Sequence, residues 1–293
     1  MLRSKRVTPH SLAARKREGQ RFAAVTAYDY TSAQIVDTAE VPFILVGDTL
    51  GMVVQGENST LPVTLEQVIY HAGLVSRGAQ SALIIGDLPF MTYHASAEQA
   101  LHSAGRLMQE GRIGGVKLEG GVEMADTINR LVQAGIPVCG HVGYTPQSAN
   151  TLGGPRVHGR DVESATRLIR DAEALETAGA FAVVLELVPA TVAAEVTRRL
   201  TIPTIGIGAG PDCDAEIQVF HDLFGLYTDF QPRHTRRYLN MAEDLVKAAR
   251  QYAYDVGERS FPGPQQYSDL TPEARHRFYA QVGNPTSGPR SPS

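Results

Sequence analysis

The stretch Phe43–Gly51 reads FILVGDTLG, in which four apolar residues are followed by a glycine and then by an acid. A continuous apolar run of this length is typical of a strand that is buried on both faces of a parallel sheet. The pattern recurs in Ala82–Phe90 (ALIIGDLPF), Gly115–Gly121 (GVKLEGG) and Ala182–Pro189 (AVVLELVP). The sequence therefore predicts several buried parallel strands, each followed or ended by a carboxylate.

Apolar runs of this kind alternate with segments of helical period along most of the chain, which is typical of parallel strands joined by crossover helices. Helices are expected over Ser96–Glu110, Val122–Ala134 and Val162–Ala178, and Thr8-Pro9 resembles the capped start of an N-terminal helix. The expected strands are Phe22–Ala27, Phe43–Val46, Ala82–Ile85, Gly115–Leu118, Pro137–Gly140, Ala182–Leu185, Pro203–Ile207 and, on a weaker pattern, Leu223–Tyr227. Seven or eight such repeats favour a (β/α)₈ TIM barrel with an N-terminal helix.

The chain of 293 residues is long enough for one barrel domain, which we expect over residues 1–260. Residues 261–293 are rich in Pro, Ser, Gly and Gln and end NPTSGPRSPS. Because such a composition buries little apolar surface, we predict a partly disordered C-terminal tail, with a short helix over Pro272–Val282.

Composition excludes several classes of partner. A formal net charge of -4 gives no basic footprint for nucleic acid. No apolar run is long enough to span a membrane, and the N-terminus lacks the apolar core of a secretory signal. The two cysteines, Cys139 and Cys213, lie far apart and form no metal-binding motif. We therefore expect a cytoplasmic protein that acts on small molecules and binds neither nucleic acid nor membranes.

Acidic residues and a histidine fall at the predicted carboxyl ends of the strands, where a barrel of this class builds its active site. Several carboxylates at one mouth would repel each other, and a hard cation such as Mg²⁺, which prefers oxygen ligands, would relieve that repulsion. A single Asp after a strand can instead cap the next helix or sit in a turn. The residues concerned are Asp48, Asp87, Glu119, His141 and Glu186.

Three further features have two readings each. Lys117 shares a strand face with Glu119, so it could bind a substrate carboxylate, pair with Glu119 or Asp87, or do both. His141 could donate to a substrate or be a satisfied histidine at a strand end. The GIGAG segment at 206–210 could cradle a phosphate, but close backbone packing is the simpler explanation.

Long motifs in the first three quarters of the chain, from about Arg21 to Gly225, resemble the ketopantoate hydroxymethyltransferase family. The resemblance implies a (β/α)₈ barrel that assembles into a homodecamer and uses Mg²⁺. It also implies transfer of a hydroxymethyl group from 5,10-methylenetetrahydrofolate to 3-methyl-2-oxobutanoate through a Mg²⁺-stabilised enolate. The product is 2-dehydropantoate, and the reaction is the first step of pantothenate and coenzyme A biosynthesis. The motifs are VTAYDY (25–30), LVGDTLGMVVQG (45–56), STLPVT (59–64), DLPFM (87–91), VKLEGG (116–121), IPVCGHVGYTPQS (136–148) and IPTIGIGAG (202–210).

The same resemblance implies roles for individual residues. Glu186 falls on the family's base, and Asp48, Asp87 and Glu119 fall on its metal-associated acids. Thr49, where the family commonly has serine, keeps the hydroxyl expected of a substrate-binding position. The expected substrate-binding residues are Asp48, Thr49, Asp87, Lys117, Tyr28 and His141.

A Mg²⁺-dependent 2-oxo acid lyase or mutase of the phosphoenolpyruvate/isocitrate lyase type is the alternative, because such enzymes also stabilise enolates. They usually carry a loop cysteine near a lysine and a histidine, and the sequence shows no such cluster. A barrel that binds a 2-oxo acid without turning it over is a second alternative. It would bind metal without catalysis, although every candidate catalytic position here holds a competent side chain.

Overall fold

The chain folds as a closed barrel of eight parallel strands in the computed structural model, which describes residues 6–283. The strands pair in chain order, and β1 pairs with β8 to close the ring. They are β1 (Phe22–Thr26), β2 (Phe43–Val46), β3 (Leu83–Asp87), β4 (Gly115–Lys117), β5 (Val138–Gly143), β6 (Ala182–Glu186), β7 (Thr204–Ile207) and β8 (Ala215–Gln218). The barrel predicted from the sequence is thereby confirmed.

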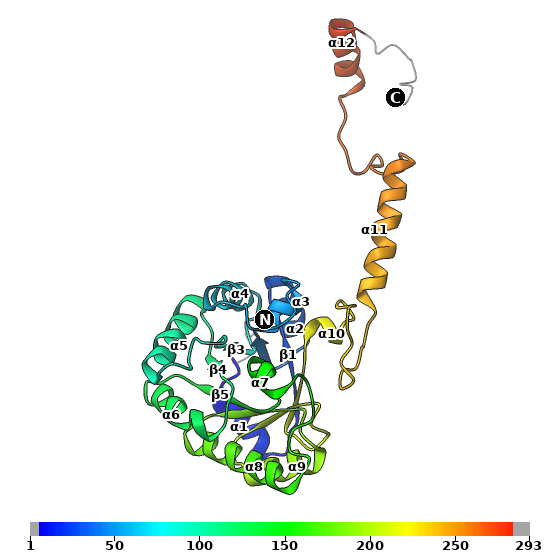
Figure 1. Cartoon of the computed structure of the whole chain (residues 1–293). Helices are drawn as coiled ribbons and strands as arrows, with labels where there is room; N and C mark the ends of the chain where they lie inside the picture. Colours follow the sequence, from blue (N-terminus) through cyan, green and yellow to red (C-terminus); the bar gives the residue numbers. More distant parts are fainter. Residues whose placement is uncertain (1–5, 284–293) are drawn as a thin grey trace. The chain divides into compact units, whose positions relative to one another are not determined.

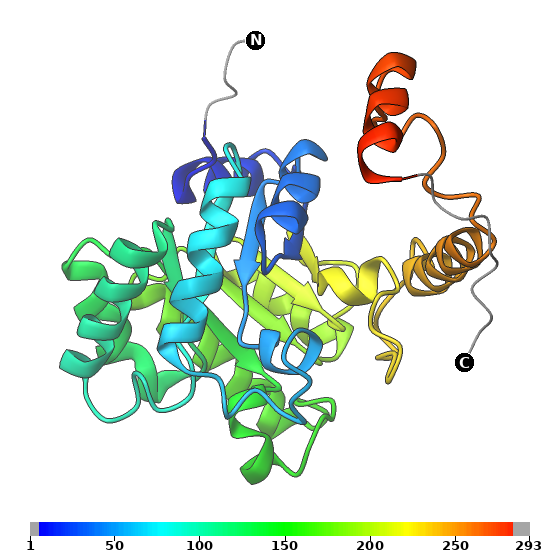
Figure 2. The same ribbon diagram turned by 90° about the horizontal axis from the view of Figure 1, so that it is seen from above.

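Helices connect most of the successive strands and surround the barrel, as the positions of α4, α5, α6, α8 and α9 show (Figure 1, Figure 2), whereas a segment without a helix leads from β7 to β8. Contacts divide the chain into two compact units, Met1–Asn240, which holds the barrel, and Met241–Ser293. The helices of the first unit are α1 (Pro9–Arg17), α2 (Tyr30–Thr38), α3 (Leu50–Val53), α4 (Leu65–Gly78), α5 (Ala97–Gly111), η1 (Val122–Met124), α6 (Ala125–Gln133), η2 (Pro146–Ser148), α7 (Ala149–Leu152), α8 (Val162–Thr177), α9 (Ala190–Arg199) and α10 (Phe220–Leu223).

The second unit contains α11 (Met241–Gly257) and α12 (Pro272–Val282). The short helix predicted within the C-terminal tail is α12, and the Thr271 side chain caps it by accepting from the Ala274 amide. The last residues of the predicted tail, 284–293, lie outside the described part of the chain. None of the helices described in residues 6–283 combines the length and apolar content needed to cross a membrane.

Both faces of strands such as β2 and β3 are buried, which explains why these strands read as unbroken apolar runs. In β2, Phe43 and Leu45 belong to the cluster that fills the barrel. Their neighbours Ile44 and Val46 belong to the cluster that packs between the barrel and the helices. Because neither face meets water, no polar residue has to alternate with the apolar ones.

The eighth strand lies elsewhere than predicted. It is Ala215–Gln218, whereas the predicted segment Leu223–Tyr227 ends helix α10 and then turns through Gly225, whose φ is +66°. Only Ala215 and Ile217 of β8 are fully buried, so the strand lacks the continuous apolar run that marks the other seven. The prediction of Leu223–Tyr227 was therefore wrong, because it relied on that run.

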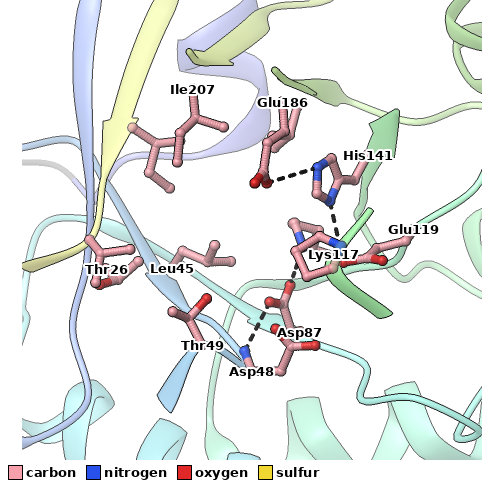
Figure 3. Close-up of a pocket in the computed structure, with 14 residues that line it drawn as sticks. Thr26, Leu45, Asp48, Thr49, Asp87, Lys117, Glu119, His141, Glu186 and Ile207 are labelled. Atoms are coloured by element: carbon pink, nitrogen blue, oxygen red, sulfur yellow. Dashed lines mark hydrogen bonds and ion pairs between the residues drawn. The ribbon is translucent and has the colours of Figure 1, made fainter. Parts of the chain in front are cut away.

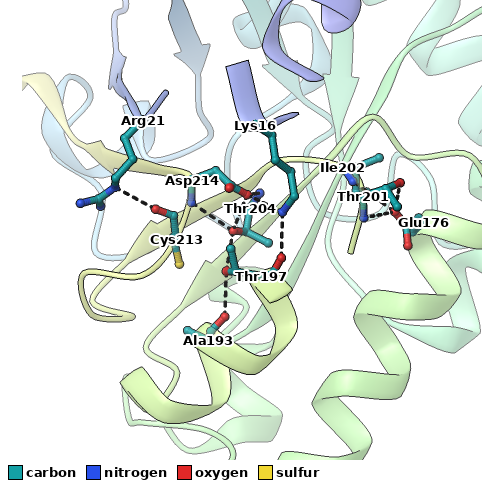
Figure 4. Close-up of polar contacts among 10 residues, drawn as sticks. All are labelled: Lys16, Arg21, Glu176, Ala193, Thr197, Thr201, Ile202, Thr204, Cys213 and Asp214. Atoms are coloured by element: carbon teal, nitrogen blue, oxygen red, sulfur yellow. Dashed lines mark hydrogen bonds and ion pairs between the residues drawn. The ribbon is translucent and has the colours of Figure 1, made fainter. Parts of the chain in front are cut away.

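Helix α1 closes the amino-terminal end of the barrel. Its start follows the prediction, since Thr8 accepts from the Ser11 amide and Pro9 opens the helix. Leu12 is fully buried in the interior cluster. Lys16 Nζ lies 2.7 Å from Asp214 Oδ2 and donates to the Thr197 carbonyl (Figure 4). With this end closed, the carboxyl ends of the strands form the open mouth.

Candidate active site

Seven of the predicted site residues line one pocket at the carboxyl ends of the strands (Figure 3). The pocket has a volume of about 50 Å³. Apolar side chains of the barrel interior, among them Leu45, Val184 and Ile217, form its floor and walls. The predicted residues that line it are Asp48, Thr49, Asp87, Lys117, Glu119, His141 and Glu186.

A buried ion pair lies in the pocket between neighbouring strands. Asp87 and Lys117 face each other in the β3–β4 register, and Lys117 Nζ lies 2.8 Å from Asp87 Oδ1. Burial lowers the pKa of Lys117, but the Asp87, Glu119 and Asp48 carboxylates outweigh it and raise that pKa. Lys117 is therefore a cation inside the barrel, as its predicted pairing with Asp87 required.

Asp48 is a buried carboxylate in an excess of negative charge. Burial raises its pKa well above the usual range, and the charges of Asp87 and Glu119 raise it further. Its Oδ2 accepts from Gln147 Nε2 at 2.8 Å, and its amide donates to Asp87 Oδ2 at 3.0 Å. The capping position of the next helix belongs to Thr49, so Asp48 is not a helix cap.

A histidine lies between two carboxylates on the opposite side of the pocket. His141 Nδ1 is 3.5 Å from Glu119 Oε1, and His141 Nε2 is 3.3 Å from Glu186 Oε2, although neither contact has hydrogen-bond geometry. Burial and Lys117 lower the pKa of His141, but the two glutamates outweigh them and raise it. An imidazolium here would lower the pKa of Glu119 and orient the Glu186 side chain towards the pocket.

The backbone is strained directly after Glu186. Leu187 has a φ of +49°, in the left-handed region that non-glycine residues rarely adopt. Its amide donates to the Ile207 carbonyl, and its carbonyl accepts from the His158 amide, so both neighbouring segments hold the turn. Such strain costs about 1–3 kcal/mol and is concentrated at functional sites.

Gln147 and Tyr93 are parts of the site that the sequence analysis missed. Gln147 Nε2 donates to Asp48 Oδ2 and to the Leu88 carbonyl, and its amide donates to Glu119 Oε2 at 3.0 Å. Tyr93 donates from its hydroxyl to Gln147 Oε1 at 2.8 Å. Gln147 lies inside the motif IPVCGHVGYTPQS, directly after Pro146 at the start of a 3-10 turn, and that position was its only sequence signal.

Tyr28, also predicted to bind substrate, is buried just outside this pocket. It is absent from the pocket lining, and its hydroxyl has no hydrogen-bond partner in the described residues. Burial raises its pKa, and the nearby charges of Asp87 and Asp48 also raise it.

The GIGAG segment packs closely against its neighbours. A Cβ on Gly206 would lie 3.0 Å from both Cys213 Sγ and Glu216 Oε2. Gly210 has a φ of +85°, and a Cβ there would meet Ala190. These contacts account for the glycines through packing, as the simpler explanation predicted.

The donor set fits a hard divalent cation. Asp48 and Asp87 present buried carboxylate oxygens to the same pocket, where burial first, and then the charges of Asp87 and Glu119, raise the pKa of Asp48 despite Lys117. Within residues 6–283 no group of three or more His, Cys, Asp or Glu side chains forms a complete ion cage. Mg²⁺ is typically held by one or two carboxylates together with water and substrate oxygens, so two aspartates suffice.

The sequence model of the ketopantoate hydroxymethyltransferase family matches residues 6–264. This chain belongs to the ketopantoate hydroxymethyltransferase family. The 3-methyl-2-oxobutanoate hydroxymethyltransferase of Chloroflexus aurantiacus is 57% identical over 267 residues, 91% of this chain and 94% of that protein. The enzyme of the same name from Carboxydothermus hydrogenoformans is 47% identical and covers 94% of this chain and 99% of its own. The family resemblance stated from the motifs is confirmed.

Solved structures of other enzymes share the fold of this ketopantoate hydroxymethyltransferase family member. Phosphonopyruvate hydrolase, solved with oxalate and Mg²⁺, superposes with a TM-score of 0.57 at 15% identity and covers 94% of this chain and 99% of its own. The corresponding values for 2,3-dimethylmalate lyase, a member of the PEP mutase/isocitrate lyase superfamily, are 0.54, 19%, 94% and 98%. At these identities the structural likeness establishes the barrel fold only, and the reaction has to be inferred from the residues of the site.

Proposed function

We propose that this chain transfers a hydroxymethyl group from 5,10-methylenetetrahydrofolate to 3-methyl-2-oxobutanoate, giving 2-dehydropantoate, the first step of pantothenate biosynthesis. One observation carries the proposal: a carboxylate base, Glu186, lines the same small pocket as the Asp48, Asp87 and Lys117 cluster. A short-chain 2-oxo acid needs both parts, because its charged end must be bound while its C3 proton is removed. Family membership supports the same assignment.

The charged end of the substrate would lie beside the aspartates and the lysine. Lys117 would offer a cation to the substrate carboxylate, and Thr49 would offer a hydroxyl at the pocket edge. Bound Mg²⁺, held by Asp48 and Asp87 and near Glu119, would supply a Lewis acid that stabilises negative charge on the keto oxygen. Asp87 would keep Lys117 protonated through their 2.8 Å contact.

Glu186 would take the proton from C3 of the substrate. General-base catalysis of this kind contributes typically about 10²–10⁴-fold. His141, 3.3 Å away, would hold the carboxylate in position for this proton transfer. C3 then forms a bond to the one-carbon unit of the folate, and one water completes the conversion to 2-dehydropantoate and tetrahydrofolate.

The test is deuterium exchange at C3 of 3-methyl-2-oxobutanoate in D₂O, followed by NMR with and without Mg²⁺. We expect Mg²⁺-dependent exchange in the wild type and a loss of about 10²–10⁴-fold in Glu186→Gln. Glu163→Gln, at a side chain that is 82% exposed, is the matched control and should exchange normally. Near-full exchange and turnover by Glu186→Gln would contradict the proposal.

The lyase or mutase alternative rests on the shared fold alone. It predicts cleavage of a carbon–carbon or carbon–phosphorus bond and needs no folate. Product analysis with 3-methyl-2-oxobutanoate and 5,10-methylenetetrahydrofolate separates the two, because only the transferase forms 2-dehydropantoate.

Assembly and location belong to the same proposal. We propose a homo-oligomer, a decamer by family resemblance, that works in the cytoplasm. Helix α11 supports a homo-oligomer, because it has no buried residue yet carries large apolar side chains. Cys139 and Cys213 are both buried free thiols. Free thiols are typical of a reducing compartment and support a location in the cytoplasm.

A further inference from the structure

A buried tyrosine hydroxyl lies behind the wall of the pocket that holds the two aspartates. Tyr93, in the connection from β3 to α5, is 1% exposed and is not among the residues that line the pocket. Its hydroxyl oxygen accepts from the Glu119 amide at 3.2 Å and lies 2.8 Å from Gln147 Oε1. The hydroxyl therefore connects the segment that follows β4 with the segment that follows β5.

The Gln147 amide can face only one way between its partners. Its Nε2 points to two acceptors, Asp48 Oδ2 at 2.8 Å and the Leu88 carbonyl at 3.0 Å. If the amide were turned over, Oε1 would face both of these oxygens, and neither an ionised carboxylate nor a carbonyl has a proton to donate. The Tyr93 hydroxyl has a single proton, which Gln147 Oε1 accepts at 2.8 Å, whereas the Glu119 carbonyl is 3.4 Å away. Both ends of the amide thus fix the same orientation.

The fixed amide in turn orients the Asp48 carboxylate. A carboxylate rotates broadly about its last side-chain bond unless one of its oxygens is held. Gln147 Nε2 holds Asp48 Oδ2, so the direction in which the second oxygen faces is restricted. The neighbouring Asp87 is held in a similar way, because Lys117 Nζ donates to its Oδ1 and the Asp48 amide donates to its Oδ2 (Figure 3). Gln147 and Lys117 therefore set how the two aspartates present their oxygens to the pocket.

Groups that lie behind a metal ligand affect how tightly a cation is bound. Mg²⁺ demands near-octahedral geometry at short distances, so a ligand that turns away from its position contributes much less. Partners that orient metal ligands change the metal affinity typically about 10- to 100-fold when they are removed. Gln147, unlike Lys117, carries no charge, so it can orient Asp48 without repelling a cation.

We propose that Gln147 and Tyr93 are positioning residues for the divalent cation, with Gln147 Nε2 orienting Asp48 and the Tyr93 hydroxyl orienting Gln147. The proposal rests on the proposed function, in which Asp48 and Asp87 hold Mg²⁺, and adds two residues that act on the cation through Asp48. Because Tyr93 acts on Asp48 through Gln147, its hydroxyl should affect the cation only while the Gln147 amide is present.

The test measures binding of Mn²⁺, a paramagnetic substitute for Mg²⁺, to the full chain without substrate, by electron paramagnetic resonance of the free ion. Gln147→Met keeps the length and neutrality of the side chain but removes its donor, and the Mn²⁺ dissociation constant should rise about 10- to 100-fold. Tyr93→Phe removes one hydroxyl and keeps the ring, and the constant should rise about 5- to 10-fold. In the double variant the constant should equal that of Gln147→Met, because Tyr93 then has no amide to orient.

Tyr70→Phe is the matched control, because Tyr70 is 64% exposed and lies on helix α4. It should bind Mn²⁺ as the wild type does, whereas Asp48→Asn should lose most of the binding and so locate the ion at this site. Each titration is paired with a thermal melt. A lower melting temperature with an unchanged dissociation constant, in both Gln147→Met and Tyr93→Phe, would show a purely structural role and overturn the inference. Tyr93→Phe alone decides the matter if Gln147→Met does not fold.

The double variant tests the order of action separately. If the effects of the two substitutions multiply, Tyr93 does not act through Gln147, and that part of the inference is wrong.

Failure of the proposed function would give a different result. A wild type that binds Mn²⁺ but neither exchanges C3 nor forms 2-dehydropantoate would overturn the proposed function, whatever the variants bind. A wild type that forms 2-dehydropantoate, together with wild-type Mn²⁺ affinity in Gln147→Met and Tyr93→Phe, would overturn this inference alone.

Discussion

Gln147, an uncharged residue, is hydrogen-bonded to several of the charged and polar groups of the site. It connects Asp48, the Leu88 carbonyl, Glu119 and Tyr93, which come from three different segments of the mouth. All of these partners are buried, so none can turn to water instead. Gln147 therefore positions the charged groups without taking part in the charge balance.

We predict that Gln147→Leu lowers the free energy of unfolding by about 2–4 kcal/mol, because the buried Leu88 carbonyl and Asp48 Oδ2 lose the Gln147 donor and the Tyr93 hydroxyl loses its Gln147 acceptor. Denaturant unfolding at a fixed protein concentration measures the change. Gln133→Leu, on an exposed helix face, is the control and should stay within about 0.5 kcal/mol. Equal unfolding of the two variants would show that the Gln147 contacts contribute little.

The role of Asp48 cannot be decided from its local sequence alone. A carboxylate after a strand is compatible with a cap, a turn or a ligand. The choice became possible only when Asp87, Glu119 and Gln147 were placed around it. Those residues lie 39 or more positions away, and no local pattern connects them.

Among the elements, strand β8 is the one that the sequence pattern placed wrongly. Its inward residues, Ala215 and Ile217, are buried, while Glu216 and Gln218 point outward and are half-buried. The strand therefore alternates, unlike its seven neighbours. Four residues of alternating polarity give too weak a signal for recognition without the ring that they complete.

Glu216 on this strand should make stability depend on pH. Burial raises its pKa from 4.5 to about 7, although Arg21 opposes the shift. Between these two values the folded protein binds more protons than the unfolded chain, so the free energy of unfolding falls as pH rises. We take the difference in unfolding free energy between Glu216→Gln and the wild type at each pH. We predict that this difference shifts in favour of the variant by about 1 kcal/mol from pH 5 to pH 8, a figure reduced for partial exposure of the carboxylate.

The measurement is the unfolding free energy of wild type and variant at both pH values. Other titrating groups are common to the two proteins and cancel in the difference. A variant whose advantage is the same at pH 5 and pH 8 would show that Glu216 titrates normally.

At the scale of the whole molecule, helix α11 points to self-association. Leu245, Tyr252 and Val256 recur at helical spacing and are all exposed, as are Val246 and Tyr254. An exposed apolar stripe of this kind marks a surface for another protein. A second copy of this chain is the partner expected from family resemblance.

We predict that static light scattering gives a mass near ten times 31.6 kDa, and that Leu245→Glu with Tyr252→Glu lowers it. Charges placed on the stripe would have to be buried on assembly, at a cost that disfavours it. Lys247→Glu, on a 71% exposed side chain of the same helix, should leave the mass unchanged. A wild type that is monomeric would contradict the oligomer, and an unchanged mass in the double variant would contradict the role of α11.

The sequence by itself determined the barrel, the N-terminal helix, seven of the eight strands and the family. These follow from patterns within short segments, since burial of both strand faces demands apolar runs and helix starts demand particular caps. The predicted residues from Asp48 to Glu186 could be named for the same reason, because strand ends of a parallel barrel converge on one face.

Tertiary structure decided the rest. Only the folded chain brings Gln147 to Asp48 and sets His141 between Glu119 and Glu186. Each of these depends on distances between segments that are far apart in the chain. Hydrogen bonds and charge interactions act over a few ångströms in space and leave no periodic trace along the sequence, so local pattern alone cannot reveal them.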